Sequence, residues 1–300
     1  MANTLTAHQA TIIGMEALAQ LRSNLVLVKR VNRNYENEVA QYGKAVTIPF
    51  FGALTANDKT AGSDVTVQDA TSTGITVTLN KHKESTFIIE DIDKALSRGD
   101  ILQGYMGSAI TVLAEKVESD LIALYSGLSQ EIGTGGTDVT AALIRTARKT
   151  LTDAKAPTSN RTLLLSTKDV NALMAADSQF LMAVNQRGNA QTLEEGIIGR
   201  YMGFDVMESQ LVPVVTADNP DSTHNIAFHK DAFALVVRPL PTDIPGNLGA
   251  VASIVQDPES GLGLRVVLSY NGNRLGVQCT VDILYGVAEL RDTFGVEVLS

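Results

Sequence analysis

Two stretches near the start of the chain carry apolar residues at a spacing of two. The first lies in residues 45–50, and the second begins at 75–79 and continues to 87–89. This spacing predicts β-strands. Residues 52–74 between them are rich in Thr, Ser, Ala, Asp and Gly, which indicates a polar tip. The pattern therefore predicts one long two-stranded hairpin over residues 43–90.

This hairpin is too long to be stable by itself. Isolated hairpins are marginal in water, and loops beyond ~12–15 residues are uncommon unless they are functional or disordered. We therefore expect it either to fold back onto the rest of the chain or to lie across another subunit. The charged residues of its tip, which we expect to be solvated, are Asp58, Lys59, Asp64 and Asp69, and Lys59 is a candidate partner for a neighbouring carboxylate.

The strongest helical pattern runs from Ile101 to Leu128. Its apolar residues recur at three and four positions, and charged residues occupy mostly the other face. The apolar positions are Leu102, Tyr105, Ala109, Leu113, Val117, Leu121, Leu124 and Leu128, and the charged ones are Glu115, Lys116, Glu118 and Asp120. At about 1.5 Å per residue such a helix extends roughly 42 Å and acts as a spine. The glycines of residues 133–136 then predict a flexible domain junction.

The other predicted elements are shorter. An amphipathic helix over residues 6–21 is marginal alone and needs a partner, either its own domain or a neighbouring subunit. Residues 25–31 are typical of a short strand. Beyond the junction, the pattern predicts a helix over 139–154 capped by Asp138, a strand over 161–166, a helix over 167–174, strands over 225–229 and 232–237, a hairpin of 264–270 and 274–288, and a last strand over 294–299.

Composition limits the class of protein. With 300 residues, of which 44% are hydrophobic, the chain can bury a large core. Its formal charge of -9 argues against a broad basic surface for nucleic acid. Cys279, the only cysteine, excludes an intramolecular disulfide and is interpreted as a small core residue. No apolar run approaches the ~20 residues that cross a bilayer, and no signal peptide is recognisable, so we expect a soluble chain made in a cytoplasm.

Spacings that carry known chemistry are missing. The sequence has no Gly-x-Ser-x-Gly elbow, no His-Glu-x-x-His pair and no complete phosphate loop. The acidic pairs Glu194–Glu195 and Asp91/Asp93 are interpreted as solvated or helix-start charges. The four histidines lie in separate segments, at His8, His82, His224 and His229. We therefore predict no catalytic residue, no cofactor and no metal site.

The order of these parts resembles the major capsid protein family of tailed bacteriophages. The resemblance is carried by the two sides of the hairpin, by a stretch in the middle of the chain and by strands near the C-terminus. These residues are Ala45–Pro49, Thr76–Glu84, Phe87–Asp91, Gly196–Ser209, Ile226–Ala232 and Asp282–Ala288. The resemblance spans nearly the whole chain, and it rests on the ordered set of parts.

The resemblance implies an α+β chain with the tailed-phage capsid fold. It divides the chain into an N-terminal arm and lead-in (1–42), an extended hairpin loop (43–90), a peripheral domain with the spine helix (91–136), an axial domain (137–256) and closing strands of the peripheral domain (257–300). The extended loop is expected to reach over a neighbouring subunit, with Asp58, Lys59, Asp64 and Asp69 as candidate contacts. No active site and no cofactor are implied.

The function implied is self-assembly through hexamers and pentamers into an icosahedral shell, the virion capsid, formed in the host cytoplasm around double-stranded DNA. Candidate further partners are a separate scaffolding protein, a portal and decoration proteins; no membrane takes part, and the DNA is held without sequence-specific contact. Lys29, Arg30 and Arg33 are candidate genome contacts, with ordinary solvated charge as the alternative. Lys59 is a candidate for a Lys–Asn crosslink between subunits, although the sequence identifies no Asn partner.

Two other functions stay open. An encapsulin-like bacterial nanocompartment has the same architecture and encloses enzymes in place of DNA. A soluble α/β enzyme belongs to a different class and predicts a monomer or small oligomer with a pocket. Particle size separates the enzyme from the shells, and the contents of the particle separate the two kinds of shell.

Overall fold

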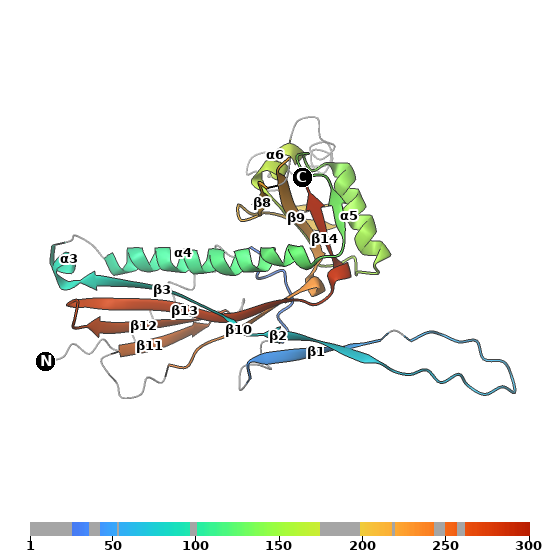
Figure 1. Ribbon diagram of the computed structural model, residues 1–300, viewed down its shortest axis with the longest axis horizontal. Coiled ribbons are helices and arrows are strands. Elements are labelled where there is room, and N and C mark those ends of the chain that lie inside the picture. Colours follow the sequence, from blue (N-terminus) through green and yellow to red (C-terminus); the bar gives the residue numbers. More distant parts are fainter. Residues whose placement is uncertain are drawn as a thin grey trace.

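The computed structural model describes residues 26–35, 43–52, 54–96, 101–174, 199–217, 220–242, 250–256 and 262–300. Figure 1 shows an elongated molecule from which a thin hairpin projects at one end. Its elements are β1 (Ala45–Phe51), β2 (Ser72–Thr78), β3 (Lys81–Glu90), α3 (Asp91–Leu96), α4 (Ile101–Ile122), η1 (Ala123–Gly127), β4 (Glu131–Gly133), α5 (Ala141–Asp153), β5 (Arg161–Leu165), α6 (Thr167–Leu173), β6 (Arg200–Tyr201), β7 (Phe204–Glu208), β8 (Val214–Val215), β9 (Ser222–His229), η2 (Lys230–Ala232), β10 (Phe233–Arg238), β11 (Ala250–Gln256), β12 (Gly263–Asn271), β13 (Gly276–Glu289), η3 (Asp292–Phe294) and β14 (Gly295–Leu299).

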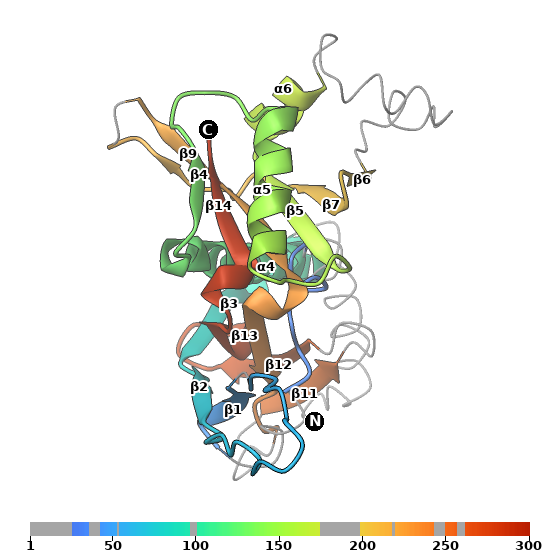
Figure 2. The same ribbon diagram turned by 90° about the vertical axis from the view of Figure 1, so that its right-hand side faces the viewer.

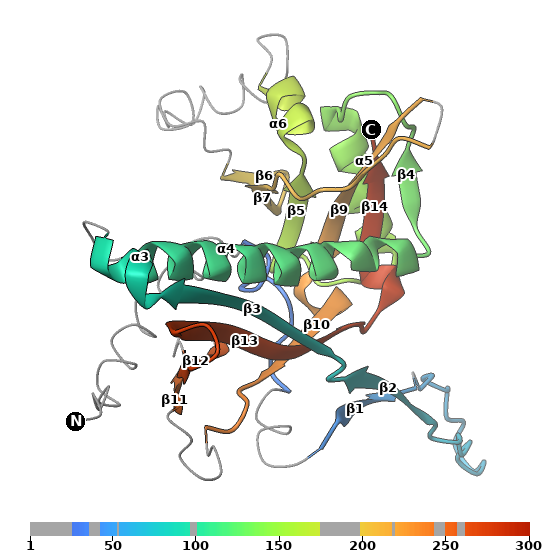
Figure 3. The ribbon, with the colours of Figure 1, turned by 60° about the vertical axis from the view of Figure 1, so that its left-hand side comes forward.

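Strands β3, β10, β11, β12 and β13 form a five-stranded sheet, and helix α4 runs between this sheet and a second one (Figure 3). The long strand β13 holds the sheet together, because it pairs antiparallel with β3, β10 and β12. Alternate residues of β13, Cys279, Val281 and Ile283, are buried together in the main core. The predicted hairpin over 264–288 is thereby confirmed, with β12 and β13 as its strands.

Helix α4 is shorter than predicted. It has 22 residues, which corresponds to a length of about 33 Å. The chain then tightens into the 3-10 turn η1 and extends at Leu128. Glycine is a poor helix former, and a Cβ atom at Gly127 would lie 2.1 Å from the Glu289 carboxylate. The regular helix thus ends at Ile122, before this glycine.

The predicted polar face of α4 is wrong in part. Glu115 and Lys116 are exposed as expected, but Glu118 and Asp120 are buried. Glu118 accepts hydrogen bonds from the backbone N–H groups of Val26 at 3.0 Å and Leu27 at 3.3 Å, so the lead-in chain covers this side of the helix. A helix that is covered on two sides buries polar residues only where they find partners.

The second sheet has seven strands in the order β4-β14-β9-β5-β7-β6, with β8 paired to β9. Every residue of β5 is buried, as the apolar run Leu163–Leu165 predicts. Helix α5 lies across this sheet (Figure 2), and Ile144, Ala147 and Leu151 are its buried residues. Helix α6 confirms the predicted helix over 167–174 and begins at a Ser166 cap.

The start of α5 differs from the prediction. Thr140 caps the helix in place of Asp138, and its hydroxyl accepts a hydrogen bond from the Leu143 N–H at 3.3 Å. Ala142, expected on the buried face, is exposed. Ile144 occupies the buried side instead.

The hairpin is shorter than predicted because its return strand belongs to two structures. Strand β1 pairs with β2 from Ala45↔Thr78 to Phe51↔Ser72. After residues 79–80 the chain continues as β3, which pairs with β13 over ten positions in the five-stranded sheet. Alternation predicts the strand correctly, but it carries no information about the partner. Residues 45–78, called the arm from here on, are the hairpin itself.

The strands of residues 233–299 are also grouped differently from the expectation. Strands β10 and β11 lie in the five-stranded sheet with β12 and β13, whereas β14 joins the seven-stranded sheet between β4 and β9. The boundary expected at residues 256–257 therefore does not separate the sheets. The physical reason is that the chain crosses from one sheet to the other more than once.

One further expectation is corrected, and one stays a prediction. Gly133 and Gly136 have φ of +100° and +77°, and Cβ atoms there would lie 2.2 Å from Leu299 O and 2.5 Å from Pro220 Cγ, so these positions require glycine, while the flexibility expected of the junction stays a prediction. Residues 27–30 form a turn, with Arg30 N–H donating to Leu27 O at 2.8 Å, instead of a strand. The helix predicted over 6–21, the pair Glu194–Glu195 and the segment 196–198 lie outside the described residues.

Candidate assembly surfaces

The tip of the arm is open to solvent. The last rung of the hairpin is Gly52 N–H donating to Thr71 O at 2.8 Å, and the described residues 54–71 contain no strand. One pair of described residues joins the two sides of the loop: Thr55 donates to Gln68 Oε1 from its N–H at 2.8 Å and from its hydroxyl at 3.1 Å, and Gln68 Nε2 donates to Thr55 O at 2.5 Å. The tip therefore satisfies most of its backbone polar groups with water.

All four charged residues predicted for the tip, Asp58, Lys59, Asp64 and Asp69, are exposed. The Lys59 ammonium donates to Thr60 O at 3.1 Å and to Ser63 O, so it is bound to its own turn and not to a carboxylate. Within the described part of the chain, the three aspartates form no ion pair. Their contact with a neighbouring subunit stays a prediction.

Four large apolar side chains on the arm are missing from the sequence-based list of contacts. Phe51 and Val67 are 86% and 85% exposed, and Leu54 and Val65 are exposed as well. Apolar groups without a core are unfavourable in water and are typical of surfaces that bind a partner. Isolated large apolar residues within an otherwise polar loop are the sequence signal that could have identified them.

The base of the arm, in contrast, has a core. Val46, Ile48, Val77 and Leu79 are buried together with Ala234 and Val236 of β10 and with Leu290, which directly follows β13. Gly286 allows the close approach, since a Cβ atom there would lie 2.3 Å from Thr78 O. The arm is therefore rooted in the body while its tip is free.

A buried polar cluster fixes α4 to the five-stranded sheet. The Asp120 carboxylate accepts a hydrogen bond from Tyr285 Oη at 2.8 Å and pairs with Lys81 at 3.0 Å and with Lys116 at 3.1 Å. Burial acts to raise the pKa of Asp120, but the hydrogen bonds from Lys81, Tyr285 and Lys116 outweigh it and lower the pKa. Each polar group has a partner, so the cluster is structural.

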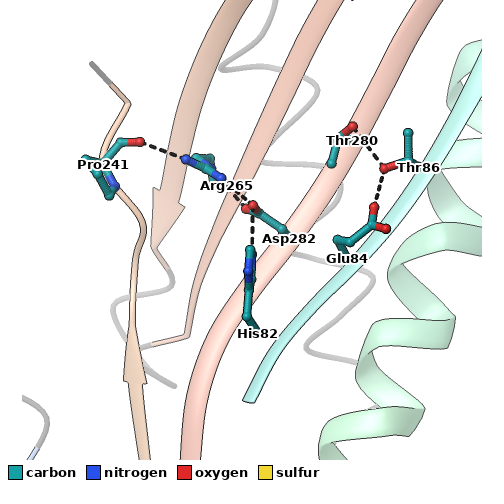
Figure 4. A network of polar contacts seen from close by, with 7 residues as sticks. All are labelled: His82, Glu84, Thr86, Pro241, Arg265, Thr280 and Asp282. Atoms are coloured by element: carbon teal, nitrogen blue, oxygen red, sulfur yellow. Dashed lines mark hydrogen bonds and ion pairs between the residues drawn. The ribbon is translucent and has the colours of Figure 1, made fainter. Parts of the chain in front are cut away.

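A second polar cluster lies on the same sheet (Figure 4). Asp282 accepts from Arg265 Nε at 3.1 Å and from Arg265 Nη2, and it lies 3.2 Å from His82 Nε2. Arg265 Nη1 also donates to Pro241 O at 3.0 Å. The fork of the guanidinium is thus satisfied on both sides, and the cluster ties β3, β12 and β13 to the chain that follows β10.

A cavity of about 550 Å³ opens beside α6 and β8 in the seven-stranded sheet. Of its lining residues, Ser166 donates to the buried Asp169 at 2.6 Å, and Lys168 pairs with Asp138 at 3.6 Å. The Asp169 carboxylate also accepts from Asn225 and Ser300 at 2.8 Å each. These groups satisfy one another, and none of the residues lining the cavity is a histidine or a cysteine.

The remaining candidates for chemistry are separate. His224 contacts Glu297 and stacks on Tyr125, whereas His82 lies with Asp282. Among the described residues no group of three or more His, Cys, Asp or Glu side chains is suited to a metal. Cys279 is fully buried, and burial raises its pKa to about 11, which keeps the thiol protonated and inert.

One basic residue of the lead-in has a partner within the molecule. Arg30 Nη1 pairs with Asp205 Oδ2 at 2.6 Å and so joins the lead-in to β7. Lys29 is exposed and Arg33 is half-buried, and contact of these three residues with a genome stays a prediction. In the part of the chain that the structure describes, no helix has the length and apolar character that a bilayer crossing requires.

No family model matches the chain, and a search of the curated proteins also finds no match. Solved structures do match. A chain of Mycobacterium phage Che8 is similar with a TM-score of 0.69 and 23% identity over 91% of this chain and 90% of that one. The capsid of cyanophage P-SCSP1u gives 0.60 and 16% over 85% and 83%, and a virus-like particle from Pyrococcus furiosus gives 0.53 and 11% over 97% and 99%. At these identities the likeness shows a shared fold, and the α+β fold expected from the resemblance is confirmed.

Proposed function

We propose that this chain, which has the tailed-phage capsid fold, is the structural subunit of an icosahedral phage capsid that encloses double-stranded DNA. The role is structural and not catalytic. The arm is the observation that carries the proposal: it is rooted in a core and exposes Phe51, Leu54, Val65 and Val67 at its free end. Exposed apolar groups gathered on a projecting element are typical of a surface that binds a partner.

The partner that fits is another copy of the chain. Figure 1 places the tip of the arm far from the rest of its own molecule, so its own body cannot cover the tip. Contacts of one copy with a different surface of the next are head-to-tail, and they close into rings when the rotation allows it. Hexamers and pentamers are such rings. Asp58, Lys59, Asp64 and Asp69 are the proposed polar contacts of the same interface.

We keep the names peripheral domain and axial domain, and we assign each to one of the two sheets. The five-stranded sheet with α4 is the proposed peripheral domain, and the seven-stranded sheet with α5 is the proposed axial domain. Scaffolding, portal and decoration proteins and location in the virion stay predictions. The net charge of -9 is compatible with a shell that confines DNA by its geometry without binding it tightly.

The test removes the tip and leaves the rooted part intact. Residues 53–70 are replaced by Asn-Gly, a dipeptide that closes a hairpin between Gly52 and Thr71, which are already hydrogen-bonded. We expect unchanged circular dichroism and urea unfolding of the subunit, and loss of shells in electron micrographs. A matched control keeps the full loop and carries Ala56→Ser at an exposed position. Shells formed at normal yield by the shortened arm would refute the proposed role of the tip.

An encapsulin-like compartment is the second candidate, because the virus-like particle from Pyrococcus furiosus shares the fold over nearly the whole of both chains. The contents of purified shells distinguish the two. Nuclease-protected double-stranded DNA supports the capsid, whereas a packaged protein without DNA supports the compartment. Only small oligomers under every assembly condition, including co-expression with partners, would overturn both.

A further inference from the structure

Connections between the two sheets lie together at one place in the molecule (Figure 3). One is the turn η2 between β9 and β10, and another is the turn η3 between β13 and β14. They are bonded to each other, because Leu290 N–H and Arg291 N–H both point to Ala232 O, at 2.7 and 3.3 Å. Movement of one connection therefore disturbs the other. We call this place the crossing, and it comprises residues 229–233 and 289–295.

The arm touches the crossing through two consecutive residues. Leu290 is buried in the small core at the base of the arm with Val46, Ile48 and Val77. The guanidinium carbon of Arg291 lies 5.0 Å from the ring centroid of Phe50 in β1. The shared core and the ring contact place the connection between β13 and η3 directly against the root of the hairpin.

The same Arg291 guanidinium also lies 5.0 Å from the ring centroid of Phe294 in η3. Phe294 in turn meets the ring of His229 edge-on, with centroids 5.8 Å apart and planes at 89°. His229 is the last residue of β9, and its Nδ1 accepts a hydrogen bond from Asp231 N–H at 3.2 Å. A continuous series of contacts thus leads from the arm to the seven-stranded sheet.

The chemistry of this series is directional. A guanidinium is planar and is attracted to the face of an aromatic ring. Arg291 has a ring on each of two sides, one from the arm and one from the crossing, so a swing of the arm separates the cation from Phe50 or draws it away from Phe294. Two elements that bias one shared contact also bias each other.

We propose that Arg291 is a positioning residue that couples the direction of the arm to the crossing between the two sheets. The inference rests on the proposed function, since the arm is taken to be the part that binds the next copy. In this arrangement a change in the angle between the sheets, made when a shell forms, redirects the arm. A purely structural role for Arg291 predicts lower stability with no change in arm direction.

Spin labels on the arm and on α5 test the coupling. The exposed residues Ser72 and Ala142 are changed to cysteine and labelled, and pulsed electron paramagnetic resonance gives the distance distribution between them. The native Cys279 is buried, with its pKa raised to about 11, and stays unlabelled. We expect one narrow distribution in the parent protein and a shifted, broader one in Arg291→Gln.

Matched variants separate positioning from stability. Arg274→Gln removes an exposed arginine that has no ring contact among the described residues and is expected to leave the distribution unchanged. Arg291→Lys keeps a cation between the rings and is expected to restore most of the parent distribution. Unfolding in urea is measured for each. An Arg291→Gln protein with the parent distance distribution overturns the inference, whatever its stability.

Assembly gives an independent measurement. Loss of two cation–π contacts is expected to lower the yield of shells by about tenfold in Arg291→Gln, with the arm tip itself unaltered. If the parent chain forms no shells but the distance distribution still responds to Arg291, the coupling holds and the proposed function fails. If shells form normally from a variant with a broadened distribution, arm direction does not limit assembly and the coupling has no functional role.

Discussion

Strand β5 and the tip of the arm are opposites in their exposure to solvent. All five residues of β5, including the polar Arg161 and Thr162, are buried, and the strand lies between β9 and β7 in the sheet. In the tip, from residue 54 to 71, side chains are exposed apart from the half-buried Gln68. The apolar groups of β5 stabilise the fold, whereas those of the tip do not contribute to it.

The comparison indicates which residues should affect the stability of the subunit and which should affect its assembly. Truncation of a side chain that is exposed in the folded subunit changes the free energy of unfolding little. Its effect is therefore expected only where the side chain contacts a partner. A buried side chain has the reverse property, because its removal leaves a cavity in every state of assembly. Stability and shell yield should therefore respond to different residues.

The largest expected effect comes from the interior. Leu163→Ala removes a fully buried side chain from β5 and should lower the free energy of unfolding by about 3 kcal/mol. Val67→Ala in the tip should change it by less than about 0.5 kcal/mol. Urea unfolding of the two variants measures the difference. Equal losses would break the comparison, since they would mean that the tip has a core of its own.

A polar interior position should come next. Glu118→Ala leaves the N–H groups of Val26 and Leu27 without their acceptor, at a cost of about 2 kcal/mol for buried donors. Glu118→Gln is the matched control, because its amide oxygen still accepts. Equal stability of the alanine and glutamine variants would show that the lead-in does not depend on this contact.

The stability of the protein should also depend on pH through the buried Glu118. Burial raises its pKa above the ordinary 4.5, with the N–H groups of Leu27 and Val26 opposing the shift. A pKa raised in the folded state means that the folded protein binds the proton more readily, so the contribution is present below pH 4.5 and is lost as pH rises through the raised value. Relative to Glu118→Gln, the parent should gain stability as pH falls from 7 toward 4.5.

His229 at the crossing should give a smaller effect of opposite sign. Burial lowers its pKa below 6.5; Asp231 opposes the shift, and Arg161, Arg291 and Lys230 add to it. A lowered pKa means that stability present above pH 6.5 is lost as pH falls through the folded value. His229→Asn cannot titrate, and its side-chain oxygen can still accept from Asp231 N–H. Unfolding curves at pH 7, 6 and 5 should diverge between the two proteins; parallel curves would count against a buried neutral His229.

The smallest effect is expected at the tip itself. Lys59→Met removes an exposed ammonium that binds only carbonyls of its own turn and should change the free energy of unfolding by less than about 0.5 kcal/mol. Lys149→Met, which removes an exposed lysine of α5, is the control. The Lys59→Met variant also tests the predicted Lys–Asn crosslink. If the crosslink forms, shells of the parent protein should show covalent multimers on a denaturing gel, and shells of the variant should not.

Several elements were predictable because one local rule decides them. The run Leu163–Leu165 is too apolar for a surface, and the strand is buried. Period-two alternation gives β1, β2 and β3 at nearly the right residues. It does not state that β2 pairs with β1 while β3 pairs with β13, since alternation fixes a face and not a partner. Asp138 and Thr140 are both good helix caps, so the local sequence does not decide between them, and the packing of α5 in the folded chain places Thr140 at the N-cap.

The position of the proposed assembly surface follows from the sequence more readily than its residues do. A long polar loop between two strands indicates the tip, and its charged residues are easy to name. Phe51 and Val67 were missed because apolar residues in a loop are normally assigned to the core.

Arg291 and its two rings could not be found, because Phe50 and Phe294 come together only through the folded positions of β1 and η3. Glu118 was misassigned since an amphipathic pattern assumes one covered face, and α4 has two.

The direct continuation of β2 into β3 has a mechanical consequence. The arm is in line with a strand that is paired to β13 from Lys81↔Tyr285 to Glu90↔Gly276, and the two follow each other along the molecule in Figure 1. A pull on the arm therefore loads this ladder in shear, and its hydrogen bonds share the force and fail together. A pull across the sheet would instead open them one by one. In the proposed shell, a subunit held in tension by its arm would thus be loaded along its strongest direction.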